Sequence, residues 1–109
     1  MLFRSALWDA TSEAKALAAK VDITLNESVK LIQEERITNA LPQVDGVIRY
    51  RSRGVMVVVG PFNFPAHLPN GHIVPALISG NTVIFKPSEQ TPAVGQLYAQ
   101  MFEIGRAHV

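Results

Sequence analysis

Two almost entirely apolar runs of residues constrain the fold of this chain more than any other feature. VMVVV spans 55–59 and TVIF, apolar apart from its first threonine, spans 82–85. Such strands are typical of a parallel sheet that helices cover on both faces. Residues 68–79 between them are predicted to be helical, and Gly80 and Asn81 lie where a helix C-cap belongs. The pattern predicts a β-α-β unit with parallel strands and a right-handed crossover.

Further helices are predicted on both sides of this unit. Thr91 is a suitable N-cap and Pro92 a suitable first residue for a helix that ends near Phe102. Residues 8–36 repeat apolar side chains at spacings of three and four, with no Gly or Pro, which predicts one long helix. The apolar positions of this helix are Trp8, Ala14, Leu17, Ala18, Val21, Leu25, Val29 and Ile32.

The region between the long helix and the first apolar strand is predicted to be more exposed. Residues 38–46 contain Pro42 and an Asp-Gly turn signal, which indicates a connector. Residues 47–53, VIRYRSR, alternate in polarity and predict an edge strand. The expected fold class is α/β: a partial Rossmann-like cofactor-binding domain with a long helix, an edge strand, a βαβα unit and an incomplete parallel sheet.

The composition argues against several classes of function. The chain has 109 residues and a formal net charge of +1, without the basic excess that nucleic acids or anionic membranes require. No apolar run reaches the roughly 18 residues of a membrane span. The lack of cysteine excludes disulfides and thiolate–metal sites and fits a reducing compartment, so a cytoplasmic protein is expected.

Two loops at the carboxyl ends of the predicted parallel strands are candidates for a site, because α/β sheets bind ligands there. In GPFNFP, residues 60–65, two prolines restrict the backbone around Asn63. A rigid amide suits an oxyanion, whereas an Asx-turn is the structural alternative. In KPSEQTP, residues 86–92, Lys86 and Glu89 offer a donor and an acceptor to vicinal hydroxyls, or form only a surface ion pair.

His67 and His72 do not predict a metal site. On a helix, residues five apart point about 140° apart, and neither cysteine nor a carboxylate cluster would complete the ligand set. A hydrogen-bonded structural role is the better interpretation of each histidine. The first strand-to-helix turn lacks G-x-G-x-x-G, and Gly71 and Gly80 do not restore it, so a dinucleotide would lie differently from the common Rossmann pose.

Three ordered motifs together resemble the NAD(P)-dependent aldehyde dehydrogenase superfamily. They are G-P-F-N-F-P, P-A-L-x-x-G-N-T-V and F-K-P-S-E-Q-T-P, within residues 54–92. FNFPAHLPNGHIVPAL and the helix LWDATSEAKALAAKVDITL resemble one branch, the N-succinylglutamate 5-semialdehyde dehydrogenases of arginine catabolism. Typical members of the superfamily carry Trp at the position of Phe62 and lack HLPNGH. The similarity covers about Ala6 to Phe102.

The resemblance implies roles for individual residues. Asn63 matches the oxyanion-hole asparagine of the family, and Lys86 and Glu89 match the pair that holds the adenosine ribose of NAD. Ser88 lies in the same segment. The implied activity of the complete enzyme, an expected homo-oligomer, is oxidation of a semialdehyde, N-succinylglutamate 5-semialdehyde, to N-succinylglutamate. The residues that match the strand end and turn lining the cofactor cleft are Val59, Gly60, Pro61 and Phe62.

The family mechanism also needs groups that lie beyond these motifs. It uses a cysteine nucleophile and a glutamate general base downstream of KPSEQTP, and this chain has no cysteine. Residues 1–109 are therefore expected to be an inactive fragment of the NAD-binding domain. Residues 1–5, MLFRS, and 104–109, IGRAHV, match the amino acids that a common sequencing adapter encodes in its two senses. Both ends are therefore expected to be adapter read-through.

Two other functions remain open from the residues. One is a non-catalytic nucleotide-binding or assembly module of the same fold. The other is an unrelated α/β binding module, in which the three ordered motifs would coincide by chance. A full-length gene with a downstream cysteine and glutamate would favour the dehydrogenase.

Overall fold

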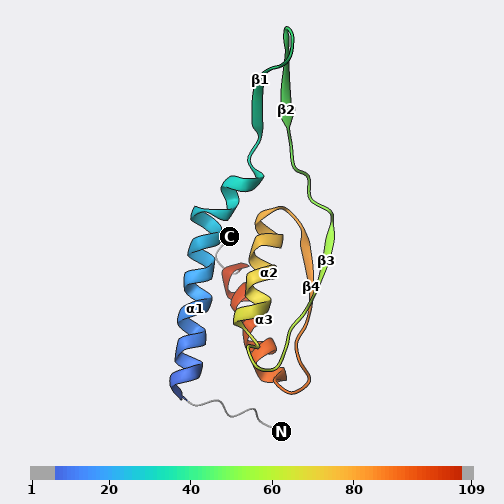
Figure 1. The fold of residues 1–109 in the computed structure, drawn as a ribbon. Coiled ribbons are helices and arrows are strands. Elements are labelled where there is room, and N and C mark those ends of the chain that lie inside the picture. Colours follow the sequence, from blue (N-terminus) through green and yellow to red (C-terminus); the bar gives the residue numbers. More distant parts are fainter. Residues whose placement is uncertain (1–6, 107–109) are drawn as a thin grey trace.

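The chain has the predicted α/β class (Figure 1). The computed structural model describes residues 7–106, in which helices α1, α2 and α3 lie on one side of the β3–β4 pair and the β1–β2 hairpin extends from one end (Figure 1). The ends expected to be adapter read-through lie outside these residues, apart from 104–106, which belong to α3. The elements are α1 (Leu7–Asn26), the 3-10 helix η1 (Ser28–Ile32), β1 (Glu35–Leu41), β2 (Val44–Ile48), β3 (Val55–Val59), α2 (His67–Ile78), β4 (Thr82–Lys86) and α3 (Pro92–Arg106).

Strands β3 and β4 pair in parallel, with α2 as the connection, which confirms the predicted unit. Val55 lies opposite Thr82, and Val59 lies opposite Lys86. The two strands therefore pair in one continuous register from end to end. Their carboxyl ends meet at one edge, as a parallel pair requires.

The turn from α2 to β4 confirms the predicted C-cap. Gly80 has φ of +80°, and its N–H donates to the Leu77 carbonyl at 3.0 Å. The N–H of Asn81 donates to the Ala76 carbonyl at 2.9 Å, which completes a Schellman motif. The Asn81 side-chain oxygen also accepts a 3.1 Å hydrogen bond from the Gly54 N–H, so this turn is tied to the start of β3.

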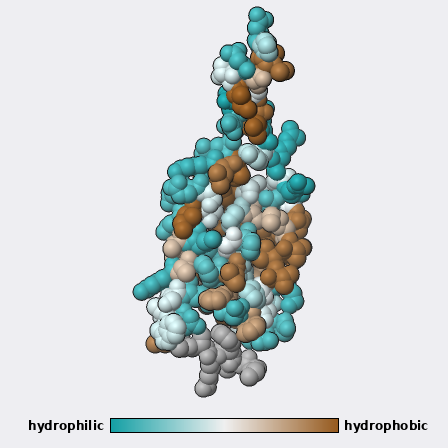
Figure 2. Space-filling model, in the orientation of Figure 1, coloured by the Kyte–Doolittle hydropathy of each residue, from teal (hydrophilic) through white to brown (hydrophobic). Residues whose placement is uncertain are grey.

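Burial of the β3–β4 pair corrects the prediction that helices cover both faces. Val58 is 4% exposed and packs with Ile73 of α2 and Tyr98 of α3. Val57 and Ile84 are 66% and 59% exposed. Hydrophobic side chains gather on the β3–β4 side in Figure 2. Among residues 7–106 no second helical layer covers that face, although the apolar composition of the strands suits one.

The predicted helix over residues 8–36 is wrong beyond Asn26. The chain there tightens into η1, and strand β1 begins at Glu35. The apolar spacing continues to Ile32. Spacings of three residues fit a 3-10 helix as well as an α-helix, so periodicity does not show where one gives way to the other.

The region between η1 and β3 is a hairpin, so the predicted connector over 38–46 is wrong apart from the turn at Pro42. The predicted edge strand over 47–53 is confirmed only at Val47 and Ile48, the last two residues of β2. Strands β1 and β2 pair antiparallel, and the chain reverses at Pro42. Asp45 of the predicted turn lies in β2, where its carboxylate accepts a 2.9 Å hydrogen bond from the Asn39 N–H of β1. The pairing of β1 with β2 determines that the turn lies at Pro42. The Asp-Gly dipeptide alone does not indicate that position.

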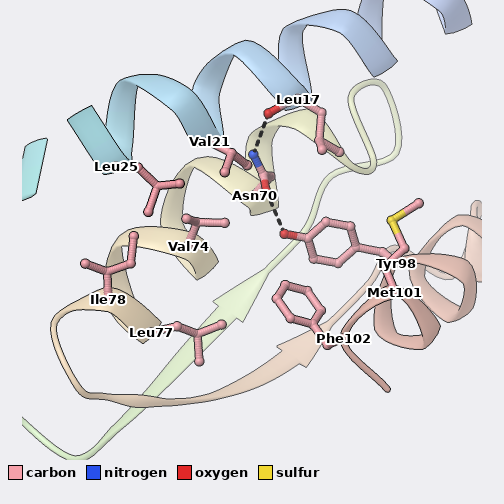
Figure 3. A pocket seen from close by; sticks show the side chains of 10 residues that line it. All are labelled: Leu17, Val21, Leu25, Asn70, Val74, Leu77, Ile78, Tyr98, Met101 and Phe102. Carbon is pink, nitrogen blue, oxygen red and sulfur yellow. Dashed lines mark hydrogen bonds between the residues drawn. The ribbon is translucent and has the colours of Figure 1, made fainter. Parts of the chain in front are cut away.

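A buried amide joins the three helices (Figure 3). Asn70 of α2 is 1% exposed, and its side-chain nitrogen donates to the Leu17 carbonyl of α1 at 3.2 Å. Its side-chain oxygen accepts a 2.8 Å hydrogen bond from the Tyr98 hydroxyl of α3. The Tyr98 ring meets those of Phe85 and Phe102 edge-on. A cavity of about 350 Å³ beside this junction is lined by Leu17, Val21, Leu25, Asn70, Val74, Leu77, Ile78, Tyr98, Met101 and Phe102.

Candidate functional site

The two loops singled out in the sequence leave the sheet side by side. Val59 and Lys86 are paired as the last residues of β3 and β4. The next residue, Gly60, donates its N–H to the Lys86 carbonyl at 2.9 Å. The structure thus brings the GPFNFP and KPSEQTP segments together at the carboxyl edge of the parallel pair, where α/β folds bind ligands.

Asn63 lies in the bend that follows Pro61, and it is exposed. Phe62 beside it is 45% exposed. The alternative interpretation of Asn63 was an Asx-turn, and within residues 7–106 its side chain forms no such hydrogen bond. The amide therefore has both N–H donors available for an oxygen of a ligand.

Gly60, the residue before this loop, lies very close to the side chains of Pro69 and Phe85. A Cβ atom there would lie 2.9 Å from Cγ of Pro69 and 3.0 Å from Cε2 of Phe85. Both distances are shorter than a carbon–carbon contact allows, so only glycine fits. The glycine of the GPFNFP motif therefore allows β3 to end tightly against α2.

The carboxylate of Glu13 holds the other end of the loop. Its Oε1 atom accepts hydrogen bonds from the N–H groups of Ala66 at 2.9 Å and His67 at 3.0 Å. The sequence alone does not reveal this role of Glu13, because the residue lies in α1, 53 residues before Ala66. One indirect signal exists: α2 begins after an alanine, so its first N–H groups need an acceptor from elsewhere.

Lys86 and Glu89 form an exposed ion pair, which is compatible with both interpretations of these residues. The Nζ atom of Lys86 lies 3.2 Å from Oε2 of Glu89, and the two side chains are 60% and 80% exposed. Hydrogen bonding to its own backbone and the nearby Lys86 ammonium lower the pKa of the Glu89 carboxyl. The pair is thus a charged donor and acceptor that solvent reaches, a combination that suits vicinal hydroxyls.

Ser88 shapes the turn between these two residues and α3. It is 7% exposed, and its hydroxyl oxygen accepts a 3.2 Å hydrogen bond from the Gln90 N–H. Its carbonyl accepts a 3.1 Å hydrogen bond from the Thr91 N–H. The structure therefore gives Ser88 a local role in the turn, and its hydroxyl hydrogen remains available as a donor.

Helix α3 begins at Pro92 as predicted, but the predicted side-chain cap is wrong. The hydroxyl oxygen of Thr91 is buried without a hydrogen-bond partner, and its carbonyl accepts the Val94 N–H at 3.2 Å. The helix instead packs closely on the loop. A Cβ atom at Gly95 would lie 2.4 Å from Cβ of Pro87, so glycine is needed for this contact.

The two histidines do not gather metal ligands. His67 and His72 both lie in α2, and no group of three His, Cys, Asp or Glu side chains suited to a metal occurs in residues 7–106. The predicted hydrogen-bonded role fails at His67, whose Nδ1 atom is buried without a partner.

None of the helices in the described part of the chain is long and apolar enough to cross a membrane.

Comparisons with known proteins show which family this chain is similar to. A family model described as "Aldehyde dehydrogenase family" matches residues 4–105. N-succinylglutamate 5-semialdehyde dehydrogenase 2 of Caulobacter vibrioides is 50% identical over 94% of this chain and 21% of its own. The N-succinylglutamate 5-semialdehyde dehydrogenases of Novosphingobium aromaticivorans and Sphingopyxis alaskensis are 49% and 52% identical over 88% and 82% of this chain, and over 20% and 18% of theirs.

The chain therefore spans about a fifth of the length of the curated relatives it matches. The family match covers nearly all of the chain, including both loops at the carboxyl edge of the parallel pair. The chain belongs to the aldehyde dehydrogenase family.

Proposed function

We propose that this chain is the part of an NAD-dependent N-succinylglutamate 5-semialdehyde dehydrogenase that holds the cofactor ribose and supplies an oxyanion donor. The observation that supports it best is the 2.9 Å hydrogen bond from the Gly60 N–H to the Lys86 carbonyl. It keeps the segment that carries Asn63 next to the segment that carries Lys86 and Glu89. The chain thus presents an amide donor and a ribose-binding pair from two loops at one edge of the parallel pair.

In the proposed reaction Asn63 stabilises the negative charge that develops on the substrate oxygen. A cysteine thiolate from outside residues 1–109 attacks the aldehyde carbon, and the carbonyl oxygen becomes an alkoxide. The Asn63 amide donates a hydrogen bond to that oxygen. Lys86 and Glu89 would hold the ribose of NAD, which would supply the hydride acceptor for the same carbon. Water then releases the acid from the resulting thioester.

The donors and acceptors present fit the ribose of a dinucleotide. Lys86 donates and the Glu89 carboxylate accepts, so together they suit the two hydroxyls of a diol. Hydrogen bonding to its own backbone and the nearby Lys86 ammonium lower the pKa of the Glu89 carboxyl, which favours its charged form. A carboxylate there would repel a 2′-phosphate, which favours NAD over NADP. The backbone from Val59 to Phe62 and the Ser88 hydroxyl complete the proposed contacts.

Further properties of the complete enzyme belong to the same proposal. The substrate is the semialdehyde that the names of the relatives give. A homo-oligomer is proposed because the hairpin exposes apolar side chains, with Leu41 65% and Val44 52% exposed. A cytoplasmic location is proposed because the chain lacks cysteine and resembles enzymes of amino-acid catabolism.

The role of Asn63 is tested in the parent enzyme, the full-length protein whose gene contains this segment. Asn63→Ala should lower kcat by roughly 10²–10³, as loss of an oxyanion donor does. Asn26→Ala is the matched control, because this exposed asparagine at the end of α1 only donates to the Asp22 carbonyl. An unchanged kcat in Asn63→Ala would rule out the oxyanion role.

The proposal also holds that residues 1–109 alone do not oxidise the aldehyde, because they contain no cysteine. The purified chain should form no NADH from the semialdehyde, as followed by absorbance, while the parent enzyme does. Turnover by the purified chain would contradict the mechanism. A parent protein that binds NAD but lacks the nucleophile would instead indicate a non-catalytic nucleotide-binding module.

A further inference from the structure

One carboxylate of α1 reaches the first N–H groups of α2. Oε1 of Glu13 accepts hydrogen bonds of 2.9 and 3.0 Å from Ala66 and His67. Helix α2 has no side-chain cap at Ala66 and no acidic residue in its first turn. The first N–H groups of a helix have no partner within it and favour a negative charge. Glu13 therefore acts as a cap supplied by a different helix.

This cap is one anchor of the segment that carries Asn63. A second anchor is the hydrogen bond from the Gly60 N–H to the Lys86 carbonyl, at 2.9 Å. Asn63 is the middle residue of the segment 61–65 between the anchors, and Pro65 at its end is buried. Since Asn63 itself is exposed and makes no side-chain hydrogen bond within residues 7–106, its position depends on how the backbone of this segment is held.

We propose that Glu13 is a positioning residue for Asn63. By capping α2 it fixes the end of the loop and so holds the Asn63 amide where a developing oxyanion can meet it. This inference rests on the proposed function, because it gives Glu13 a task only if Asn63 has one. A hydrogen-bond donor is effective when it is held in place before the reaction, and a shift of about 1 Å can lower a rate by roughly 10².

A double-mutant cycle in the parent enzyme tests the proposal. Glu13→Ala should lower kcat roughly tenfold and leave the Kd for NAD unchanged, since loss of an anchor displaces the donor only in part. In the Asn63→Ala background the same change should have no further effect on kcat, because the amide it positions is gone. Each kcat is divided by the concentration of active nucleophile from burst titration, so that loss of folded enzyme does not contribute.

Two further variants separate positioning from general stability. Glu13→Gln keeps a carbonyl oxygen as acceptor and should recover most of kcat. Glu13→Asp keeps the charge but is one methylene shorter, and it should lower kcat. If Glu13→Ala does not fold, the comparison of Glu13→Gln with Glu13→Asp still tests the proposal. Asp22→Ala, at an exposed carboxylate of the same helix, is the matched control and should leave kcat unchanged.

Several results would overturn the inference. One is a loss of kcat by the same factor in both backgrounds, which indicates a structural role for Glu13 that does not act through Asn63. Another is an unchanged kcat in Glu13→Ala, or in Glu13→Asp, while Asn63→Ala lowers kcat. If Asn63→Ala itself leaves kcat unchanged, the proposed function fails and the inference fails with it.

Discussion

The hydroxyl of Tyr98 donates a 2.8 Å hydrogen bond to the side-chain oxygen of Asn70, and both residues are buried. Tyr98→Phe removes the donor and leaves that oxygen buried without this partner. The expected cost is about 1–3 kcal/mol in the free energy of unfolding. Urea unfolding of the chain, followed by circular dichroism, measures it. Tyr50→Phe is the control, because Tyr50 is 59% exposed. Equal effects of the two changes would contradict the prediction.

Stability at high pH should depend on Tyr98. Burial raises the pKa of this tyrosine to about 12. As pH rises above the ordinary tyrosine value of about 10, the unfolded chain loses this proton while the folded chain keeps it. The unfolded state then binds fewer protons, so stability is fully present below about pH 10 and falls as pH rises towards 12.

The measurement compares urea unfolding of the original chain and Tyr98→Phe at about pH 9 and at about pH 11.5. The stability advantage of the original chain should shrink between the two conditions. Tyr50→Phe should retain the decline, because it leaves Tyr98 in place. A constant difference between the original chain and Tyr98→Phe would show that the proton of Tyr98 is not linked to folding.

Gly95→Ala should destabilise the contact between α3 and the KPSEQTP loop. The new Cβ atom would lie 2.4 Å from Cβ of Pro87, so helix and loop must separate. Overpacking of this kind costs about 1–3 kcal/mol. Gly71→Ala is the matched control in α2, where the new atom meets only Cε of the flexible Lys20, at 3.4 Å. It should be neutral or stabilise the helix by up to about 1 kcal/mol. Thermal unfolding of both variants checks the contrast.

Lys86→Ala in the parent enzyme should weaken NAD binding and leave kcat at saturating NAD nearly unchanged. A hydrogen bond from a charged donor contributes about 1.5–3 kcal/mol, so the Kd for NAD should rise roughly 10- to 100-fold. Calorimetric titration measures the Kd. Lys30→Ala is the matched control, since Lys30 forms the same kind of exposed pair with Glu27 at 2.9 Å. An unaltered Kd in Lys86→Ala would show that the ribose assignment is wrong.

The parts of the fold that the sequence predicted correctly are those with a local cause. The apolar strands ending at Val59 and Lys86 were recognised from composition, and the C-cap at Gly80 from its residue type. The side-by-side position of the two loops followed from the rule that parallel strands end at one edge. The bounds of the first helix and the β1–β2 hairpin were predicted wrongly. Each depends on which backbone hydrogen bonds form, and the spacing of apolar residues does not show that.

The sequence by itself therefore determined the parallel unit, the family and the segment in which Asn63 lies. Only the tertiary structure decided what holds these pieces in place. Glu13 caps a helix that begins 54 residues later, and Asn70 bonds a tyrosine 28 residues later. Such contacts form only when packed helices bring distant side chains within 3 Å or so of each other, at hydrogen-bond distance. Residue type marks a possible donor or acceptor, and the packing of α1, α2 and α3 selects its partner.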